Sequence, residues 1–146
     1  MNIRQAQEGD VEKIFAIDHI SRMEEERRQF ISKSVHDGNT FIAVTDNQIL
    51  GYSVLEHSFF NRGFITLIMV DPNRRRSGIG SALIHHVEGL CESNRIFTST
   101  NESNQPMRAL LKKLGYKQSG VVNDLDPGDP ELFYSRKLKV EDNNVN

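Results

Sequence analysis

The stretch at residues 70–80, VDPNRRRSGIG, governs the interpretation of this chain, because it puts three arginines and two glycines between a hydrophobic run and a helical pattern. The run before it, FITLIMV at residues 64–70, is almost continuously apolar, as in a strand that is covered on both faces. After it, apolar residues recur on one helical face over residues 77–93. The arginine- and glycine-rich stretch is therefore predicted to be a strand-to-helix turn.

Such a turn has the chemistry to bind a phosphate ester. A helix that starts near Gly78 points its first backbone N–H groups and the positive end of its dipole at the turn. Glycines at 78 and 80 lack the Cβ atoms that would keep a pyrophosphate from the backbone, and the arginines at 74–76 add donors. A dinucleotide fingerprint would need a glycine at Leu83, and a P-loop would need a Gly-Lys-Ser/Thr ending, so neither fits. A tight turn with solvated arginines is the alternative.

The rest of the chain alternates predicted strands and helices. In chain order we expect a strand at residues 2–6, helices from residue 11 and over residues 21–35, a hairpin over residues 40–56 that turns at Asp46-Asn47, the strand at 64–70, the helix at 77–93, a strand at 95–100, a helix over 103–116 that stops at Gly115, and strands at 116–122 and 131–138. The predicted order is β-α-α-β-β-β-α-β-α-β-β.

Length and composition limit the class of protein. The 146 residues predict one domain over residues 1–138 and a frayed tail at residues 139–146. The formal net charge of -2 argues against a nucleic-acid partner. A lone cysteine, Cys91, excludes an internal disulfide and fits a reducing compartment. No apolar run approaches the roughly 20 residues that span a bilayer, so we expect a cytoplasmic protein without membrane contact.

A second motif, NQPMRALLKKLGY at residues 104–116, follows the first in the chain. Together with Arg75-x-x-Gly78-x-Gly80 it resembles the GCN5-related N-acetyltransferase (GNAT) family, whose motifs are R/Q-x-x-G-x-G/A and N-x-x-A-x-x-L-Y-x-x-x-G-F. The resemblance extends over nearly the whole chain. It implies an α/β (α+β) fold, with a mixed, mostly antiparallel central sheet of about seven strands and flanking helices.

The resemblance also implies how acetyl-CoA, the family's cosubstrate, would be held. In that family the first turn binds the pyrophosphate of coenzyme A, and the pantetheine arm lies between the fourth and fifth strands. By position, the pyrophosphate would contact Arg75, Arg76, Ser77, Gly78, Ile79 and Gly80. The backbone of Met69 and Val70 would face the pantetheine and thioester, and Asn104 would bond to the pantetheine arm, with Asn101 assisting. Asn104 is also placed to cap the helix that follows it, and one side chain could do both.

The chain departs from the family at its usual general acid. The family's tyrosine is replaced by Leu111. A thiol, with a pKa of about 8.5, leaves tolerably as a thiolate, and a positioned acid typically adds about 10²- to 10⁴-fold. Tyr116, Ser99, Thr100 or a water could substitute. Tyr116 ranks first for its phenol, although a core residue at a strand start is the other interpretation.

The family's usual base, a glutamate on the fourth strand, is also missing, because FITLIMV contains no carboxylate. The nearest candidates are Glu56 and His57 at the end of the preceding strand. Adjacent strand residues point to opposite faces, so a regular strand turns only one of them toward a cleft. His57 has the more suitable intrinsic pKa, about 6.5. Either could instead be an ordinary surface residue.

Two further groups of polar residues stand out in the sequence. His85 and His86 are adjacent on a predicted helix, which is not a metal-ligand spacing, so no metal site is expected. The segment NDLDPGDPELF at residues 123–133 carries four acids: Asp124, Asp126, Asp129 and Glu131. It is either a solvated turn or an acidic border that favours a cationic acceptor.

The sequence therefore predicts an acetyl-CoA-dependent N-acetyltransferase in which an amine attacks the thioester directly. A non-catalytic acyl-CoA-binding or sensing module is the alternative, motivated by the missing acid and base. The acceptor amine, the acyl length and the choice between monomer and homodimer are left open.

Overall fold

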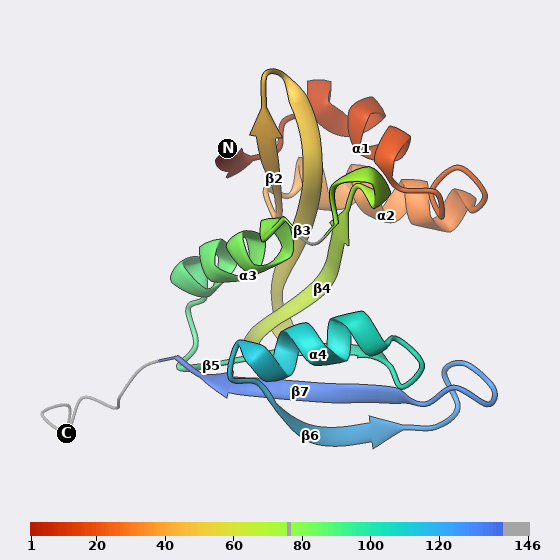
Figure 1. Ribbon diagram of the computed structural model, residues 1–146, viewed down its shortest axis with the longest axis vertical. Helices are drawn as coiled ribbons and strands as arrows, with labels where there is room; N and C mark the ends of the chain where they lie inside the picture. Colours follow the sequence, from red (N-terminus) through yellow and green to blue (C-terminus); the bar gives the residue numbers. More distant parts are fainter. Residues whose placement is uncertain (76, 139–146) are drawn as a thin grey trace, which may run out of the picture. The chain divides into compact units, whose positions relative to one another are not determined.

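The computed structural model describes residues 1–75 and 77–138; the predictions for Arg76 and for the tail at 139–146 lie outside the described residues. Its elements are β1 (Asn2–Gln5), α1 (Val11–Ile17), α2 (Glu25–His36), β2 (Thr40–Thr45), β3 (Gln48–Phe59), β4 (Arg62–Val70), α3 (Ile79–Leu90), β5 (Arg95–Asn101), α4 (Gln105–Lys113), β6 (Lys117–Val122) and β7 (Glu131–Lys137), as Figure 1 shows. This order of strands and α-helices confirms the predicted order.

The strands form one sheet in the order β1-β2-β3-β4-β5-β7-β6. β4 and β5 pair in parallel, whereas β1–β2, β2–β3, β5–β7 and β6–β7 pair antiparallel. The mixed, mostly antiparallel sheet of seven strands is therefore confirmed, and β4 takes the central place expected of its apolar sequence. None of the described helices is long and apolar enough to cross a membrane.

Two compact units make up the chain. The first holds Met1–Leu55 and Leu67–Leu90, and the second holds Glu56–Thr66 and the described residues from Cys91 onward. The single domain expected over residues 1–138 stays a prediction, and the two units are described in turn.

The first unit buries apolar side chains on both faces of its strands. On one face, α1 and α2 pack against β2 and β3 around Ile14, Ile42 and Tyr52. On the other face, α3 packs through Ile79 and Leu83 (Figure 1). Because successive residues of a strand alternate between faces, each face of the unit needs its own apolar set, and the strands supply both.

The end of β4 shows why its sequence is apolar without interruption. Leu67 and Met69 pack on the cluster that includes α1 and α2, while Ile68 and Val70 pack on the cluster of α3. A strand with helices on both faces has no position that favours a polar side chain. The predicted strand with two covered faces is confirmed for this segment.

Gly51 of β3 lies where α3 and β4 approach the strand closely. A Cβ atom built on Gly51 would stand 2.7 Å from the carbonyl oxygen of Met69, 3.2 Å from Cδ1 of Leu83 and 3.3 Å from Cγ2 of Ile79. The missing side chain lets the first turn of α3 settle against the sheet. An isolated glycine inside a strand pattern is the sequence signal for such a contact.

Gly51→Ala is expected to lower the free energy of unfolding by about 1–3 kcal/mol, the usual range for overpacking a filled interior. The backbone carbonyl that the new methyl group meets is fixed in a strand and cannot turn aside as a side chain would. Urea unfolding measured by circular dichroism gives the difference. Gly89→Ala in α3 is the control, because its Cβ meets no atom within 4 Å and alanine favours helix, so it should be neutral or stabilising. Equal effects of the two changes would contradict the close contact.

Left-handed backbone conformations occur at both sharp hairpin turns of β3. Asp46 and Asn47, with φ of 50° and 64°, form the predicted turn after β2, and Phe60 and Asn61, with 51° and 63°, form the turn before β4. Two consecutive residues with positive φ match the twist of a two-residue hairpin. Gly115, with φ of 90°, follows α4 and confirms the predicted end of that helix.

The predicted helix over residues 21–35 starts later than expected, since α2 begins at Glu25. The side chain of Asp18 accepts hydrogen bonds from the backbone N–H groups of Ile20 and Ser21, at 3.0 and 3.4 Å. These bonds hold the segment after α1 in turns rather than in helix.

In the second unit, buried and half-buried side chains alternate along β5. Ile96, Thr98 and Thr100 of β5 are buried, whereas Phe97 between them is half-buried. Phe97 and Phe133 both lie against Phe59, with ring centroids 5.3 and 6.0 Å from it, so aromatic rings fill that face of the unit.

Candidate functional site

The turn between β4 and α3, in the first unit, is held by short-range hydrogen bonds. The backbone N–H of Asp71 donates to the carbonyl oxygen of Leu50 in β3 at 2.8 Å. The Asp71 carboxylate accepts the N–H of Asn73 at 3.0 Å and so caps a single 3-10 turn, Pro72–Arg74. The hydroxyl of Ser77 then donates to the carbonyl oxygen of Arg74. The arginine- and glycine-rich turn is thus anchored to the sheet at one end and to itself at the other.

Gly78 gives the start of α3 its geometry. Its φ of 81° lies in the left-handed region that side-chain-bearing residues avoid, and its carbonyl oxygen accepts the N–H of Ala82 at 3.0 Å. The N–H groups of the first helical turn have no partner within a helix, and Ser77 and Gly78 beside them are exposed. A Cβ on Gly78 would meet no protein atom within 4 Å, so the glycine serves the backbone conformation and leaves open space for a ligand.

Two hollows of the first unit border this turn. One, of about 420 Å³, is lined by Met1, Leu50, Asn73, Arg74, Arg75, Ser77 and Ile79. Its neighbour, of about 380 Å³, shares Arg74, whose Nη2 donates to Oε1 of Gln48 at 3.1 Å. Three of the predicted pyrophosphate contacts, Arg75, Ser77 and Ile79, therefore line one hollow.

Gly78 and Gly80 belong to the same turn and first helical residues, and Met69 and Val70 end the strand that leads into them. The side chains of Met69 and Val70 are half-buried and pack on opposite faces of β4.

The two predicted asparagines lie in the second unit and have local roles there. Oδ1 of Asn104 accepts the N–H of Met107 at 3.2 Å, which confirms that it caps α4. Nδ2 of Asn101 donates to Oδ2 of Asp126 at 2.9 Å and to the carbonyl oxygen of Asp129 at 3.3 Å. The amide nitrogen of Asn101 is thus bonded to the acidic loop. The amide nitrogen of Asn104 has no partner among the described residues, so it is available to a ligand.

The acidic loop is fastened by its own carboxylates. Asp129 accepts both the N–H and the hydroxyl of Ser103, at 3.1 and 2.5 Å, and Asp126 is held by Asn101. Two of the four acids therefore act within the protein, which favours the interpretation as an ordered turn. Of the four loop acids, Asp124 and Glu131 are the two whose carboxylates have no partner among the described residues.

The two candidate bases of the second unit differ in what they contact. Oε1 of Glu56 accepts the hydroxyl of Thr66 in β4 at 2.6 Å, and its carboxylate retains further acceptor sites. Nε2 of His57 accepts the backbone N–H of Glu92 at 3.0 Å, so its lone pair is already in use. The geometry favours Glu56 over His57.

Tyr116, the candidate acid, is only 3% exposed. Its ring is buried in the second unit at the start of β6, as the core interpretation of the sequence expects. Leu111, which replaces the family's tyrosine, is 1% exposed and equally part of that core. A buried phenol has poor access to a leaving thiolate, and this weighs against Tyr116 as the acid.

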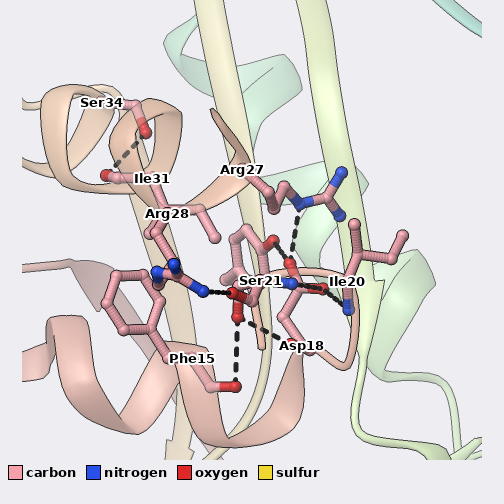
Figure 2. A network of polar contacts seen from close by, with 9 residues as sticks. Phe15, Asp18, Ile20, Ser21, Arg27, Arg28, Ile31 and Ser34 are labelled. Carbon is pink, nitrogen blue, oxygen red and sulfur yellow. Dashed lines mark hydrogen bonds and ion pairs between the residues drawn. The ribbon is translucent and has the colours of Figure 1, made fainter. Parts of the chain in front are cut away.

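Sequence reasoning missed a buried polar network around Asp18, in the first unit (Figure 2). Asp18 is 0% exposed, yet besides the two N–H groups already described it accepts the hydroxyl of Tyr52 at 2.5 Å and Nε of Arg27 at 2.8 Å. Burial alone raises the pKa of Asp18, but the hydrogen bonds from Tyr52 and Arg27 outweigh it and hold that pKa below its usual value. Burial, and then the bond to Asp18, raise the pKa of Tyr52, so its hydroxyl stays protonated. Nothing in the sequence pattern links these residues.

Comparison with known proteins identifies the family of this chain. Residues 5–116 match the model of the acetyltransferase (GNAT) family. A solved GNAT-family acetyltransferase from Bacillus cereus is 35% identical, with a TM-score of 0.86 over 93% of this chain and 96% of that one. The peptidyl-lysine N-acetyltransferase YjaB of Salmonella typhimurium is 28% identical over 89% of this chain and 92% of its own. An N-alpha-acetyltransferase of Sulfurisphaera tokodaii is 27% identical over 82% of each. The chain therefore belongs to the GNAT family and is an acetyltransferase.

Proposed function

We propose that this acetyltransferase binds acetyl-CoA at the turn between β4 and α3 and transfers the acetyl group to an amine. The observation that carries the proposal is the left-handed Gly78 at the start of α3, beside a hollow lined by Arg75, Ser77 and Ile79. Free backbone N–H groups, a helix N-terminus and an exposed guanidinium are the donors that suit a pyrophosphate. Met69, Val70 and Asn104 are then proposed contacts of the pantetheine arm, as the family resemblance implies.

The chemistry follows from the charge state of the acceptor. An amine arrives mostly as ammonium and must lose a proton before its nitrogen can attack the thioester carbonyl. The new C–N bond forms, the C–S bond breaks and coenzyme A leaves as a thiolate, which takes up a proton. Glu56 is proposed to accept the ammonium proton, because its carboxylate is half-buried and only partly used by Thr66.

The acceptor class is suggested by the relatives, which act on a peptidyl lysine in one case and on an alpha-amine in the other, as their names state. A primary amine of a peptide or of a small molecule fits both. A preference for a cationic acceptor is also proposed, and only Asp124 and Glu131 of the four loop acids support it. Asp126 and Asp129 are already bonded within the protein.

The proposal is tested by following thiol release from acetyl-CoA with a panel of amines. The panel contains peptides with a free N-terminus, peptides whose amine is a lysine side chain, and small amines. Thiol release that requires an amine, together with an acetylated product in mass spectrometry, supports the proposal. Calorimetric binding of coenzyme A without turnover of any amine would instead favour the non-catalytic module.

Glu56→Gln is expected to lower kcat by about 10²- to 10⁴-fold at neutral pH, the usual contribution of a positioned base. Glutamine keeps the size of the side chain and can still accept from Thr66 but cannot take a proton. Because a larger fraction of the amine is already neutral at high pH, the deficit should shrink as pH rises. Steady-state kinetics from neutral to alkaline pH measures this. Glu92→Gln, an exposed change in the same unit, is the matched control; equal effects of both would remove Glu56 from the mechanism.

A further inference from the structure

Arg27, in the first turn of α2, is anchored by only one of its three side-chain nitrogens. Its Nε donates to the buried carboxylate of Asp18 at 2.8 Å, and its side chain is 17% exposed. Figure 2 shows the two terminal nitrogens directed away from Asp18. Over residues 1–75 and 77–138, these nitrogens have no carboxylate or carbonyl partner, and the only other group that interacts with the guanidinium is the Tyr52 hydroxyl beside Asp18.

The acids next to Arg27 in sequence do not use these donors. Glu24, Glu25 and Glu26 are exposed, and Glu25 pairs with Arg28 instead. Arg28 also donates to the carbonyl oxygen of Ser21 at 2.6 Å, so both terminal nitrogens of this neighbouring arginine have protein partners. Arg27 is the arginine here whose terminal N–H groups remain for a ligand.

The bond from Nε to Asp18 fixes the position of the Arg27 guanidinium. Asp18 has no exposed surface and is itself fixed by four donors from three parts of the first unit. A planar guanidinium held through Nε presents its terminal nitrogens as a rigid fork, and that fork matches the two oxygens of a carboxylate. A surface arginine would lose side-chain entropy on binding, whereas this one has already lost most of it.

Arg27 lies on the same face of the sheet as part of the site proposed for acetyl transfer. Tyr52, which donates to the same Asp18 carboxylate as Arg27, belongs to the apolar cluster on which Leu67 and Met69 of β4 pack. The turn that we propose for the pyrophosphate continues into α3, which packs on the opposite face. Arg27 is therefore placed on the face of β4 away from α3, on the side to which the Met69 side chain points.

We propose that the terminal nitrogens of Arg27 bind a carboxylate of the acceptor, so that the enzyme prefers amines that carry a carboxylate. The inference rests on the proposed function, because it assigns the ligand of this arginine to the acceptor. Asp18 already balances the charge of Arg27, and such an acceptor, with one ammonium and one carboxylate, adds no net charge to the site. The carboxylate has two sources: a free amino acid, or an acidic residue near the amine of a peptide.

The test compares acceptors that differ only in the carboxylate. Leucine, lysine and phenylalanine are paired with isopentylamine, cadaverine and phenethylamine, and peptides with aspartate beside the reactive amine are paired with the asparagine versions. Thiol release gives kcat/KM for each, expressed per free amine. The wild-type protein should prefer the carboxylate-bearing member by about 10- to 100-fold in at least one of the two series, as expected for a hydrogen bond between charged groups. The series that shows the preference identifies the source.

Variants then assign the preference to Arg27. Arg27→Lys keeps a cation for Asp18 but loses the fork, and it should reduce the preference about tenfold or more while changing the rates of carboxylate-free amines little. Arg22→Gln, which removes an exposed arginine of the same segment, should leave the preference unchanged. A wild-type protein without preference in either series overturns the inference, even if Arg27→Lys folds poorly, and so does an equal loss for all acceptors in a folded Arg27→Lys. Thiol release from no acceptor overturns the proposed function and this inference with it.

Discussion

Asp18→Ala is expected to lower the free energy of unfolding by about 3–5 kcal/mol, the range seen when one partner of a buried ion pair is removed. The change leaves the buried Tyr52 hydroxyl, the half-buried Arg27 guanidinium and two backbone N–H groups without their acceptor. Urea unfolding followed by circular dichroism measures the loss. Asp37→Ala removes an exposed ion pair with Lys33 that solvent screens, and it should have a much smaller effect. Similar losses for both variants would show that the network around Asp18 adds nothing beyond a surface pair.

The same network predicts how stability depends on pH. The folded protein holds the pKa of Asp18 below the value of about 3.9 that the carboxyl group has in an unfolded chain. Its contribution is therefore complete above that value and is lost as pH falls through the lowered pKa of the folded state. The stability of the wild-type protein should fall more steeply below about pH 4 than that of Asp18→Ala. Parallel slopes in acid would contradict the lowered pKa.

Gly78→Val is expected to weaken binding of coenzyme A by about 10- to 100-fold. The φ of 81° at this position is strained for any residue with a side chain and most of all for a β-branched one. Valine would pull the turn out of the left-handed region and turn the first N–H groups of α3 away from the pyrophosphate. Calorimetric titration with coenzyme A gives the affinity, and thermal unfolding shows whether the variant is folded.

Gly128→Val is the matched control for this change. Gly128 has a φ of 79° and, like Gly78, no atom within 4 Å of a built Cβ, but it lies in the acidic loop of the second unit. It introduces the same backbone strain without touching the proposed pyrophosphate turn, so affinity should be kept. Unchanged affinity in a folded Gly78→Val would remove the turn from the binding site.

Features that depend on residues close together in the chain could be predicted from the sequence, whereas contacts between residues far apart in the chain could not. The hairpin at Asp46-Asn47 and the glycine-rich start of α3 are encoded within a few residues, and both were predicted. The bond between Tyr52 and Asp18 spans 34 residues, and no spacing rule connects a tyrosine in a strand with an aspartate after a helix. The shortened start of α2 was missed although its cause is local, because the bonds from Ile20 and Ser21 to Asp18 span only two and three residues.

The choice among candidate bases shows the same limit. Alternation along a strand indicated that Glu56 and His57 point to opposite faces, but it could not say which had a free lone pair. The partner of His57 is the backbone of Glu92, 35 residues away, beyond the end of α3. The acidic loop also needed the structure, since the donors of Asn101 and Ser103 decide which carboxylates remain for a ligand.

The strand order β5-β7-β6 has a consequence for biosynthesis. β7 (Glu131–Lys137) pairs with β5 along Arg95–Asn101 on one side and with β6 on the other, yet the ribosome makes it after both. Until it emerges, at about 5–20 residues per second, β5 lacks its antiparallel neighbour and β6 has no strand to pair with. The nascent chain therefore exposes two unpaired strand edges, the usual targets of chaperones and the usual sites of aggregation, until its last described strand is inserted between them.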